Sequence, residues 1–534
     1  MPIPLPRAFF PLRHRVFRTL WLATLASNTG MWVQNTGAGW LMTSLDPSPF
    51  MVSLVQAASM LPVFLLALPA GALADIVDRR LFLIAAQLWM LCMALLLALL
   101  TLTDSLGAWG LLALTFGIGA GSAINFPAWA ATTPELVPRE DLVGAVALNG
   151  IGFNLARALG PALGGFAIAA AGPEAAFSLN AVAFLTLILA LIAWRRPAAF
   201  RSTLPKEHLV GAMRAGVRFV AASPAMQAAI LRACAFFLPA AAVWGLLPLL
   251  VRGQLGLGPE AFGLMLGVMG ASAVGAGFVL PALRARLDRG ALVFRSSLLV
   301  AVAMGLLALA EHWSLAALAM AMYGAAWIAA GSTLSVAAQV AAPAWVRARA
   351  IAIYQLSFFG MMAFGAALAG WVGTRFGVAP ALAAAALASL GLALLVRPWR
   401  LDPSAAAAAR DLAKSVPTPE APAAELETLL GERSGRVLEV VRYCIDPDDR
   451  SAFLTAMREV RQARLRTGAL TWRLYEDVAH PQRWVELWAV GNWTEHLREA
   501  HRLTEGDLDA LARAAAFHKA TEPLEASRYL NVPP

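Results

Sequence analysis

Long stretches without a charged residue recur along the first 400 residues, and they constrain the fold more than any other feature. Nine of these stretches are each about as long as the roughly 20 apolar residues that cross a bilayer, or longer. They cover residues 19–45, 47–74, 81–103, 105–134, 175–194, 261–283, 312–346, 350–374 and 376–396. Three more, residues 142–173, 219–251 and 290–310, contain one arginine each. Because lipid offers no partner to an exposed backbone amide, all twelve are predicted to be transmembrane helices.

The charge of the chain supports a membrane protein and fixes its expected orientation. Charged residues make up 14% of the sequence, against roughly 25% in soluble domains. With the N-terminus inside, the cytoplasmic segments hold 20 lysines and arginines, whereas the outer turns hold only Arg252 and Arg375. This asymmetry predicts that both termini are cytoplasmic. It also accounts for the net charge of +9 as an orientation signal, so we expect the lipid bilayer and not nucleic acid as a partner.

A polar segment and an internal repeat divide the membrane part into two halves. Residues 195–224 form the longest and most polar connection, and they separate residues 1–194 from residues 225–400. A shift of 205 residues aligns Gly119 with Gly324, Pro138 with Pro343, Gly160 with Gly365, Leu163 with Leu368, Gly165 with Gly370, and Gly172 with Gly377. Two repeated six-helix halves predict transport by rocking of one half against the other around a midplane site.

The last quarter of the chain differs in character. Residues 401–432 combine an alanine run with three prolines and are predicted to be a linker. Residues 433–534 have the composition of a soluble domain. Alternating strand patterns and helical patterns there predict the order β-α-β-β-α-β of a ferredoxin-like, cytoplasmic domain. The strands are expected at 436–445, 469–477, 483–490 and 524–530, and the helices at 447–466, 493–502 and 505–516.

The connection between the second and third apolar stretches carries four charges in six residues. It reads Gly71-Ala72-Leu73-Ala74-Asp75-Ile76-Val77-Asp78-Arg79-Arg80. We expect Gly71, Asp75, Arg79 and Arg80 to act in gating, with Asp75 capping a helix or pairing with an arginine when the halves meet at the cytoplasmic mouth. The alternative is a plain polar turn. The counterpart at 283–290 keeps its arginines but lacks an aspartate matching Asp75, so the latch is predicted to be one-sided.

The fifth apolar stretch combines a deep arginine with small residues. Arg157 lies fourteen residues from residue 143, or about 21 Å along a helix. An arginine at that depth faces a cavity or a partner, so a substrate-binding role and a structural pairing both stay open. Small residues and a proline follow at once and predict close helix packing. They are Gly160, Pro161, Gly164 and Gly165.

Polar and aromatic side chains are predicted to line a substrate cavity. On the first stretch, Asn28, Trp32 and Asn35 recur at spacings of four and three and share a helix face. Asn149 lies two helical turns before Arg157 and shares its face. The other members of the expected cavity are Asn125 and Tyr354. Interhelical hydrogen bonds are the alternative role for each of these side chains.

The ionisable groups constrain the energy source. The aspartates and glutamates of the membrane part all lie at the ends of the apolar stretches, whereas proton-coupled transporters usually relay through a buried carboxylate. If transport is proton-coupled, Asp75 is the best candidate, or the substrate carries the proton. The sequence has no G-x-x-x-x-G-K loop for ATP. The cysteines and histidines lack metal-ligand spacing, so no cofactor and no metal are expected.

Several motifs resemble one family of transporters. The G-x-L-A-D-x-x-x-R-R loop resembles that of the major facilitator superfamily. Its enterobactin-exporter-like branch, the transmembrane secretion effectors, is further resembled by Arg18-Thr19-Leu20-Trp21, Trp32-x-x-Asn35, Pro127-Ala128 and Leu136-Val137-Pro138. The resemblance implies a secondary exporter of siderophore-like or other amphipathic small molecules across the bacterial inner membrane.

The tail resembles a second family. Arg483-Trp484-Val485-Glu486 and Trp493-Thr494-Glu495-His496-Leu497-Arg498 look like segments of antibiotic-biosynthesis-monooxygenase-like domains, which usually form dimers. The resemblance implies a regulatory or homodimerising module, and we expect no enzyme activity. The alternative is a bifunctional protein whose tail acts on the exported molecule.

Overall fold

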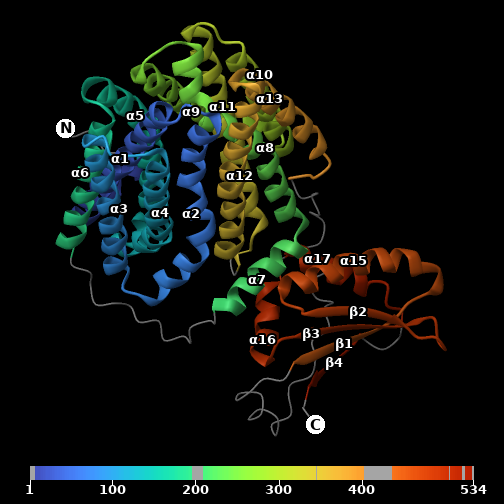
Figure 1. Ribbon diagram of the computed structural model, residues 1–534. Coiled ribbons are helices and arrows are strands. Elements are labelled where there is room, and N and C mark those ends of the chain that lie inside the picture. The colour runs from blue at the N-terminus through green and yellow to red at the C-terminus, as the bar shows by residue number, and fades with distance from the viewer. Residues whose placement is uncertain are drawn as a thin grey trace, which may run out of the picture. The chain divides into compact units, whose positions relative to one another are not determined.

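The computed structural model describes residues 7–194, 209–343, 346–401, 436–503, 505–519 and 524–531. The chain divides into two compact units (Figure 1). The first comprises Met1–Pro205, Ala229–Val336 and Tyr354–Leu401. The second comprises Lys206–Ala228, Ala337–Ile353 and Asp402–Pro534. The predicted linker at 401–432 lies outside the described residues, apart from Leu401.

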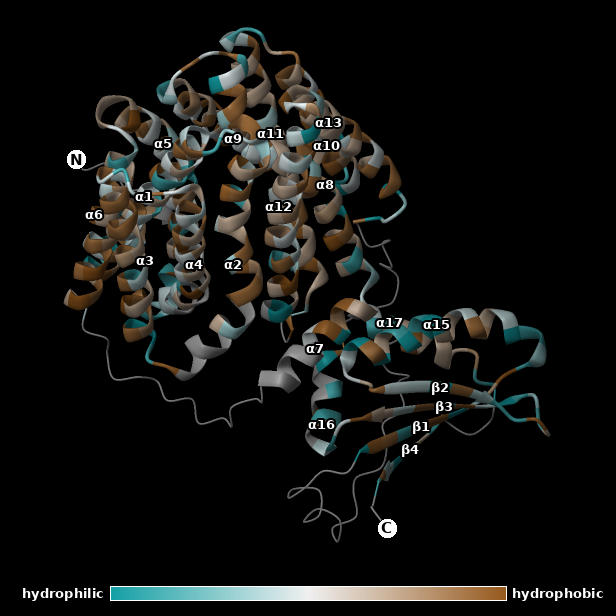
Figure 2. Cartoon of the chain, in the orientation of Figure 1, coloured by the Kyte–Doolittle hydropathy of each residue, from teal (hydrophilic) through white to brown (hydrophobic). Residues whose placement is uncertain are grey.

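Long helices make up the first unit. Those of the N-terminal half are α1 (Arg15–Leu45), α2 (Pro49–Ile76), α3 (Arg79–Leu102), α4 (Ala108–Leu136), α5 (Leu142–Ala171) and α6 (Pro173–Ala193). After α7 (Leu209–Ala222), which belongs to the second unit, the C-terminal half contains α8 (Pro224–Leu249), α9 (Pro259–Arg286), α10 (Arg289–Ala308), α11 (Trp313–Ala341), α12 (Arg347–Phe376) and α13 (Val378–Leu395). Hydrophobic residues run along the length of these helices (Figure 2).

Eleven of the described helices are long and apolar enough to cross a membrane. They are α2 to α6 and α8 to α13. Helix α1 has 31 residues but is not among them, because polar side chains such as Asn28, Gln34 and Asn35 recur along it. The twelfth membrane span therefore stays a prediction.

The two halves begin their third helices in the same way. Asp78 accepts hydrogen bonds from the backbone N–H groups of Arg80 and Leu81 and caps α3. Asp288 accepts one from Ala291 and caps α10. Each carboxylate satisfies amides that have no partner within the helix and lies at its positive end. The aspartate that both halves share is thus a helix cap.

The C-terminal domain is a four-stranded antiparallel sheet with helices against one face (Figure 1). Its elements are β1 (Val437–Cys444), α15 (Arg450–Thr467), β2 (Thr471–Glu476), β3 (Arg483–Val490), α16 (Trp493–Arg502), α17 (Glu505–Ala515) and β4 (Glu525–Leu530). The strand order is β2-β3-β1-β4. Phe453 and Met457 of α15 pack on Trp484 and Trp488 of β3 to form the core. The strands lie where the sequence predicts them.

Candidate translocation pathway

Helix α5 approaches α1 closely because glycines occupy the contact. A Cβ atom on Gly160 would lie 2.5 Å from Cβ of Trp32, and one on Gly164 would lie 3.0 Å from the carbonyl oxygen of Val33. Neither position has room for a larger side chain. The small residues at these positions therefore bring the backbone of α5 against α1.

The same helix meets α9 of the opposite half. A Cβ atom on Gly165 would lie 2.9 Å from Cα of Gly263, and one on Gly263 would lie 2.9 Å from Cα of Gly165. The carbonyl oxygen of Pro161 would lie 2.5 Å from the Cβ on Gly263. Further along, a Cβ on Gly270 would lie 2.5 Å from Cα of Ala158. The two halves thus touch backbone to backbone along one half of α5.

A second contact between the halves involves the start of α2. A Cβ atom on Gly370 of α12 would lie 2.6 Å from Cβ of Ser53, and one on Gly245 of α8 would lie 2.8 Å from Oγ of Ser53. The backbone N–H of Phe50 donates to Oγ1 of Thr374 at 3.0 Å. These residues belong to the same end of the bundle as Gly165 and Gly263, since α2 and α9 begin there and α5 and α12 end there.

The opposite ends of the helices are more open. Among the described residues, a Cβ on Gly275 or Gly277 of α9 would have no neighbour within 4 Å, and the side chain of Phe278 is 82% exposed. Two arginines at the start of α3 lie at this end and contact other helices of the N-terminal half. Arg79 forms an ion pair with Glu135 at 2.8 Å, and Arg80 donates to the carbonyl oxygens of Leu191 and Ile192 at the end of α6.

The predicted gating residues are only partly described. The side chains of Gly71 and Asp75 lie outside the described residues, so the latch stays a prediction. The contacts of Arg79 with Glu135 and of Arg80 with the end of α6 join helices of one half. Gating through these two arginines therefore also stays a prediction.

Aromatic rings connect the two halves in the middle of the bundle. The ring centroids of Trp32 and Trp244 lie 5.8 Å apart, and those of Trp244 and Trp327 also lie 5.8 Å apart. Phe153 of α5 contacts Trp32 at 6.4 Å. The indole N–H of Trp244 is buried. Trp244 and Trp327 are not among the residues predicted to line the cavity, and the sequence signal for them is a tryptophan inside an apolar stretch.

The predicted polar residues have different environments. Asn125 accepts a hydrogen bond from Gln87 at 3.0 Å, and Asn149 donates to Thr133 at 3.1 Å. Both bonds join neighbouring helices of the N-terminal half, as the alternative role requires. The second amide atom of Asn149, its Oδ1, is buried without a partner among the described residues. Tyr354 is 4% exposed.

Arg157 lies near the middle of α5. Its guanidinium donates to Oδ1 of Asn154 at 2.8 Å, and Asn154 in turn donates to the carbonyl oxygen of Gly150. Asn28 and Asn35 on α1 are half-buried. Asn154 is a neutral partner, so its contact with Arg157 does not balance the positive charge of the guanidinium.

Comparison with known proteins defines the family. Residues 7–533 match the family model described as transmembrane secretion effector. The chain belongs to this family. Enterobactin exporter EntS of Escherichia coli is 28% identical to this secretion effector over 328 residues, which cover 60% of the chain and 76% of EntS. The MFS-type transporter YfiS of Bacillus subtilis is 27% identical over 257 residues, covering 47% of the chain and 60% of YfiS.

Solved structures with the same fold include transporters. A bacterial homologue of the human lysosomal transporter Spinster, in an inward-facing and unoccupied conformation, matches with a TM-score of 0.58 and 14% identity. The match covers 73% of the secretion effector and 97% of that chain. A bacterial homologue of the iron transporter ferroportin, in an inward-facing state, matches with a TM-score of 0.56 and 15% identity over 72% of the effector and 98% of that chain. The membrane part therefore has the major facilitator fold.

Proposed function

We propose that this secretion effector exports an amphipathic small molecule, of the siderophore class, from the cytoplasm by alternating access. The observation that carries the proposal is the pattern of contacts between the halves. Backbone contacts through Gly165, Gly263 and Gly370 join the halves at one end, and the aromatic pair of Trp32 and Trp244 joins them in the middle. The charged end, which the distribution of arginines assigns to the cytoplasm, is the one where α9 is exposed.

The proposed binding region combines aromatic surface with a positive charge. Trp32, Phe153 and Trp244 offer ring faces. Arg157 lies one turn from Phe153 on α5. It offers a cation that is hydrogen-bonded to the neutral side chain of Asn154. Planar anionic rings suit such a site, because aromatic stacking and charge-assisted hydrogen bonds both act on them. Similarity to EntS, an enterobactin exporter, supports this substrate class.

The proposal extends to coupling and location. We place the protein in the bacterial inner membrane with both termini in the cytoplasm, on the basis of the arginine asymmetry. Proton coupling through Asp75, a carboxylate of the motif at 71–80, remains part of the proposal, and a proton carried by the substrate is the alternative. An antiporter of this kind loses transport when the proton gradient collapses.

Homodimerisation of the C-terminal domain is a further part of the proposal. The sheet face opposite the helices presents Leu438, Tyr475 and Tyr529, which are exposed. Leu438 and Tyr529 lie opposite each other in neighbouring strands and form one apolar surface. Cysteines introduced at Tyr529 should give a cross-linked dimer of the full chain under oxidation, and failure to cross-link would argue against this surface.

Export is tested in cells that make a catecholate siderophore but lack its exporter. Expression of the wild-type chain should move the siderophore from the cells to the medium, and Asp75→Asn should not. A proton ionophore should abolish the effect in inverted membrane vesicles. An unchanged distribution with well-expressed protein would refute the substrate class, and ionophore-resistant transport would refute the coupling.

A further inference from the structure

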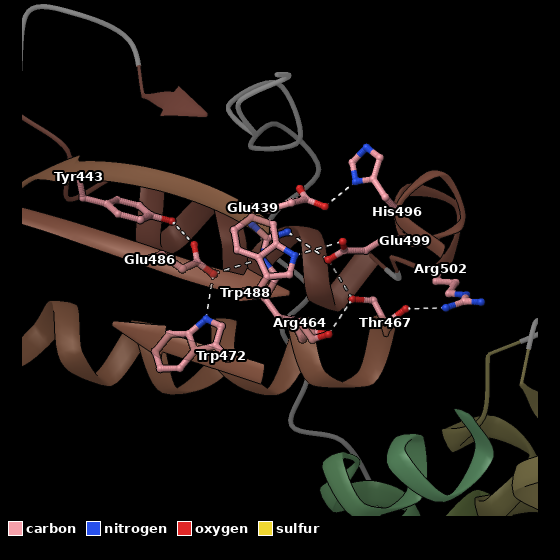
Figure 3. A network of polar contacts seen from close by, with 11 residues as sticks. Glu439, Tyr443, Arg464, Thr467, Trp472, Glu486, Trp488, His496, Glu499 and Arg502 are labelled. Carbon is pink, nitrogen blue, oxygen red and sulfur yellow. Dashed lines mark hydrogen bonds and ion pairs between the residues drawn. The ribbon is translucent and has the colours of Figure 1, made fainter. Parts of the chain in front are cut away.

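A group of buried ionisable side chains lies in the C-terminal domain, outside the proposed transport pathway (Figure 3). Glu439 extends from the central strand β1, and His496 and Glu499 extend from α16. One potential ligand atom from each residue lies within 4.8 Å of the others. Glu439 and Glu499 are buried, and His496 is nearly so. This group was not predicted, because the spacing of the histidines alone does not include Glu439, although His496 and Glu499 at i, i+3 share a helix face.

A neighbouring ion pair is complete without this group. Glu486 of β3 accepts hydrogen bonds from Tyr443 at 3.0 Å, from Trp472 at 3.0 Å, and from the guanidinium of Arg464 at 3.2 Å. The guanidinium of Arg464 also lies 3.7 Å from the ring centre of Trp488. Glu486 therefore needs no further cation. Arg464 lies closer to Glu486, at 3.2 Å, than to Glu499, at 3.7 Å.

Glu439 and Glu499 are less well compensated. Glu499 accepts from the indole N–H of Trp488 at 3.1 Å and from Thr467 at 3.4 Å, and Arg464 lies at 3.7 Å. Glu439 contacts Nδ1 of His496 at 2.5 Å. Arg528, opposite Glu439 in β4, offers partial compensation from a half-exposed position. Two buried carboxylates therefore lie beside one imidazole, and buried carboxylates are costly unless they are paired.

The three side chains are also held in place, as metal ligands usually are. Trp488 and Thr467 fix the carboxylate of Glu499, and the ring of Trp493 lies 4.8 Å from that of His496. In Figure 3, His496 turns toward Glu439, and Glu499 lies between Trp488 and Thr467. Tetrahedral zinc, with bonds of about 2.0–2.1 Å, spaces its ligand atoms about 3.4 Å apart. Zinc binding requires the contact of 2.5 Å between Glu439 and His496 to widen to that spacing and any longer separation, up to 4.8 Å, to narrow to it.

We propose that Glu439, His496 and Glu499 bind a first-row divalent metal ion, with zinc as the ion to test. A mixed set of two carboxylates and one imidazole suits zinc, manganese or iron better than calcium. The ion neutralises the two carboxylates and replaces the direct contact between His496 and Glu439. It also ties α16 to β1, so that metal supply controls the rigidity of this part of the domain. The site is independent of the proposed transport function.

The test uses the full-length protein in detergent, stripped with a chelator and then dialysed against zinc. Elemental mass spectrometry measures the zinc content per chain. We expect the wild type to hold about one zinc ion more than the triple variant Glu439→Gln/His496→Ala/Glu499→Gln. Replacement with cobalt should give visible d–d bands that the His496→Ala variant lacks. His480→Ala and Glu459→Gln serve as matched controls, since both residues are exposed and outside the group, and they should retain the metal.

The isosteric double variant Glu439→Gln/Glu499→Gln guards against misfolding. Zinc should raise the unfolding temperature of the wild type and leave that of this variant unchanged. Equal zinc content in the wild type and the triple variant would overturn the proposal. So would the absence of zinc from a folded wild type, which would mean that protonated His496 and the nearby arginines neutralise the carboxylates.

Discussion

Trp32 on α1 and Trp244 on α8 lie with their ring centroids 5.8 Å apart and their planes at 37°. The two helices belong to opposite halves of the membrane unit, so this contact must change when the halves move against each other. Trp32 was predicted from the sequence as a cavity residue, whereas Trp244 was not.

Trp244→Ala should shift the conformational equilibrium away from the state described here. An aromatic pair contributes about 0.5–1.5 kcal/mol beyond its buried area, which corresponds to roughly a two- to tenfold change in population. Distances between spin labels on the two halves measure that change. Trp109→Ala is the matched control, since Trp109 is 71% exposed. Unchanged populations in Trp244→Ala would refute a role in holding this state.

Gly165→Leu should abolish export while the protein still reaches the membrane. A side chain there would collide with the carbonyl oxygen of Pro259 at 2.5 Å, and overpacking typically costs about 1–3 kcal/mol. Cellular export assays check the loss, and membrane immunoblots check the amount of protein. Gly150→Leu on the same helix is the control, because a Cβ there has no described neighbour within 4 Å. Equal export by both variants would contradict the role of the Gly165–Gly263 contact.

Arg157→Ala should abolish the export of an anionic substrate without loss of protein. Arg157→Lys keeps the charge but not the planar guanidinium, and it should retain part of the activity. Asn154→Ala removes the side chain that accepts from Arg157 and should weaken apparent affinity more than maximal rate. Export measured over a range of substrate concentrations separates these effects. Full activity of Arg157→Ala would assign Arg157 to structure alone.

Glu486→Ala should destabilise the C-terminal domain. Glu486 is fully buried and paired with Arg464, and removal of one member of a buried pair costs about 3–5 kcal/mol. Hydrogen–deuterium exchange of peptides from β1 and β3 in the full chain measures the loss of protection. Glu476→Ala is the control, because its ion pair with Arg450 lies near the surface and such pairs contribute about 0–1 kcal/mol. Equal exchange in both variants would contradict the prediction.

The start of α5 should show a pH dependence that arises from Asp141. Hydrogen bonds from His14 and from Arg13 lower the pKa of the Asp141 carboxyl below its usual range, although burial opposes them. A lowered pKa means that the ionised carboxylate stabilises the folded state above the ordinary pKa of about 3.9 and that this contribution disappears as the pH falls through the lower, folded value. Wild type and Asp141→Asn should therefore differ in unfolding temperature at pH 5 and converge below about pH 4. Equal unfolding temperatures of the wild type and Asp141→Asn at pH 5 would contradict the prediction.

The sequence predicts the helices well because lipid leaves the backbone no alternative. Charge-free stretches such as 81–103 and 175–194 correspond to α3 and α6 within a few residues. The strands of the C-terminal domain are predicted equally well, since buried residues alternate with exposed or partly exposed residues along β3. In each case the pattern of hydrophobic residues is local in the sequence. Burial of one sheet face produces the alternation in a strand, and contact with lipid and other helices produces the apolar stretch of a membrane helix.

The partners of polar residues could not be predicted in the same way. Asn125 and Asn149 both lie in apolar helices, and their sequence context does not say that Gln87 and Thr133 face them. Glu439 and His496 lie 57 residues apart in the sequence. They meet, together with Glu499, only because β1 and α16 lie near each other in the folded domain. Such sites depend on tertiary packing, and a spacing rule on one helix does not find them.

The bond between Gln34 and Asn180 bears on how the chain is made. These two buried amides join α1 to α6 across 146 residues of sequence, and α1 is the long helix that falls short of the apolar character of the other spans. The ribosome completes α1 well before Asn180 has emerged, so during synthesis the amide of Gln34 has no such neighbour. We therefore expect the first helix to settle into the bilayer only when the sixth arrives, and insertion of the N-terminal half to be a joint event of its helices.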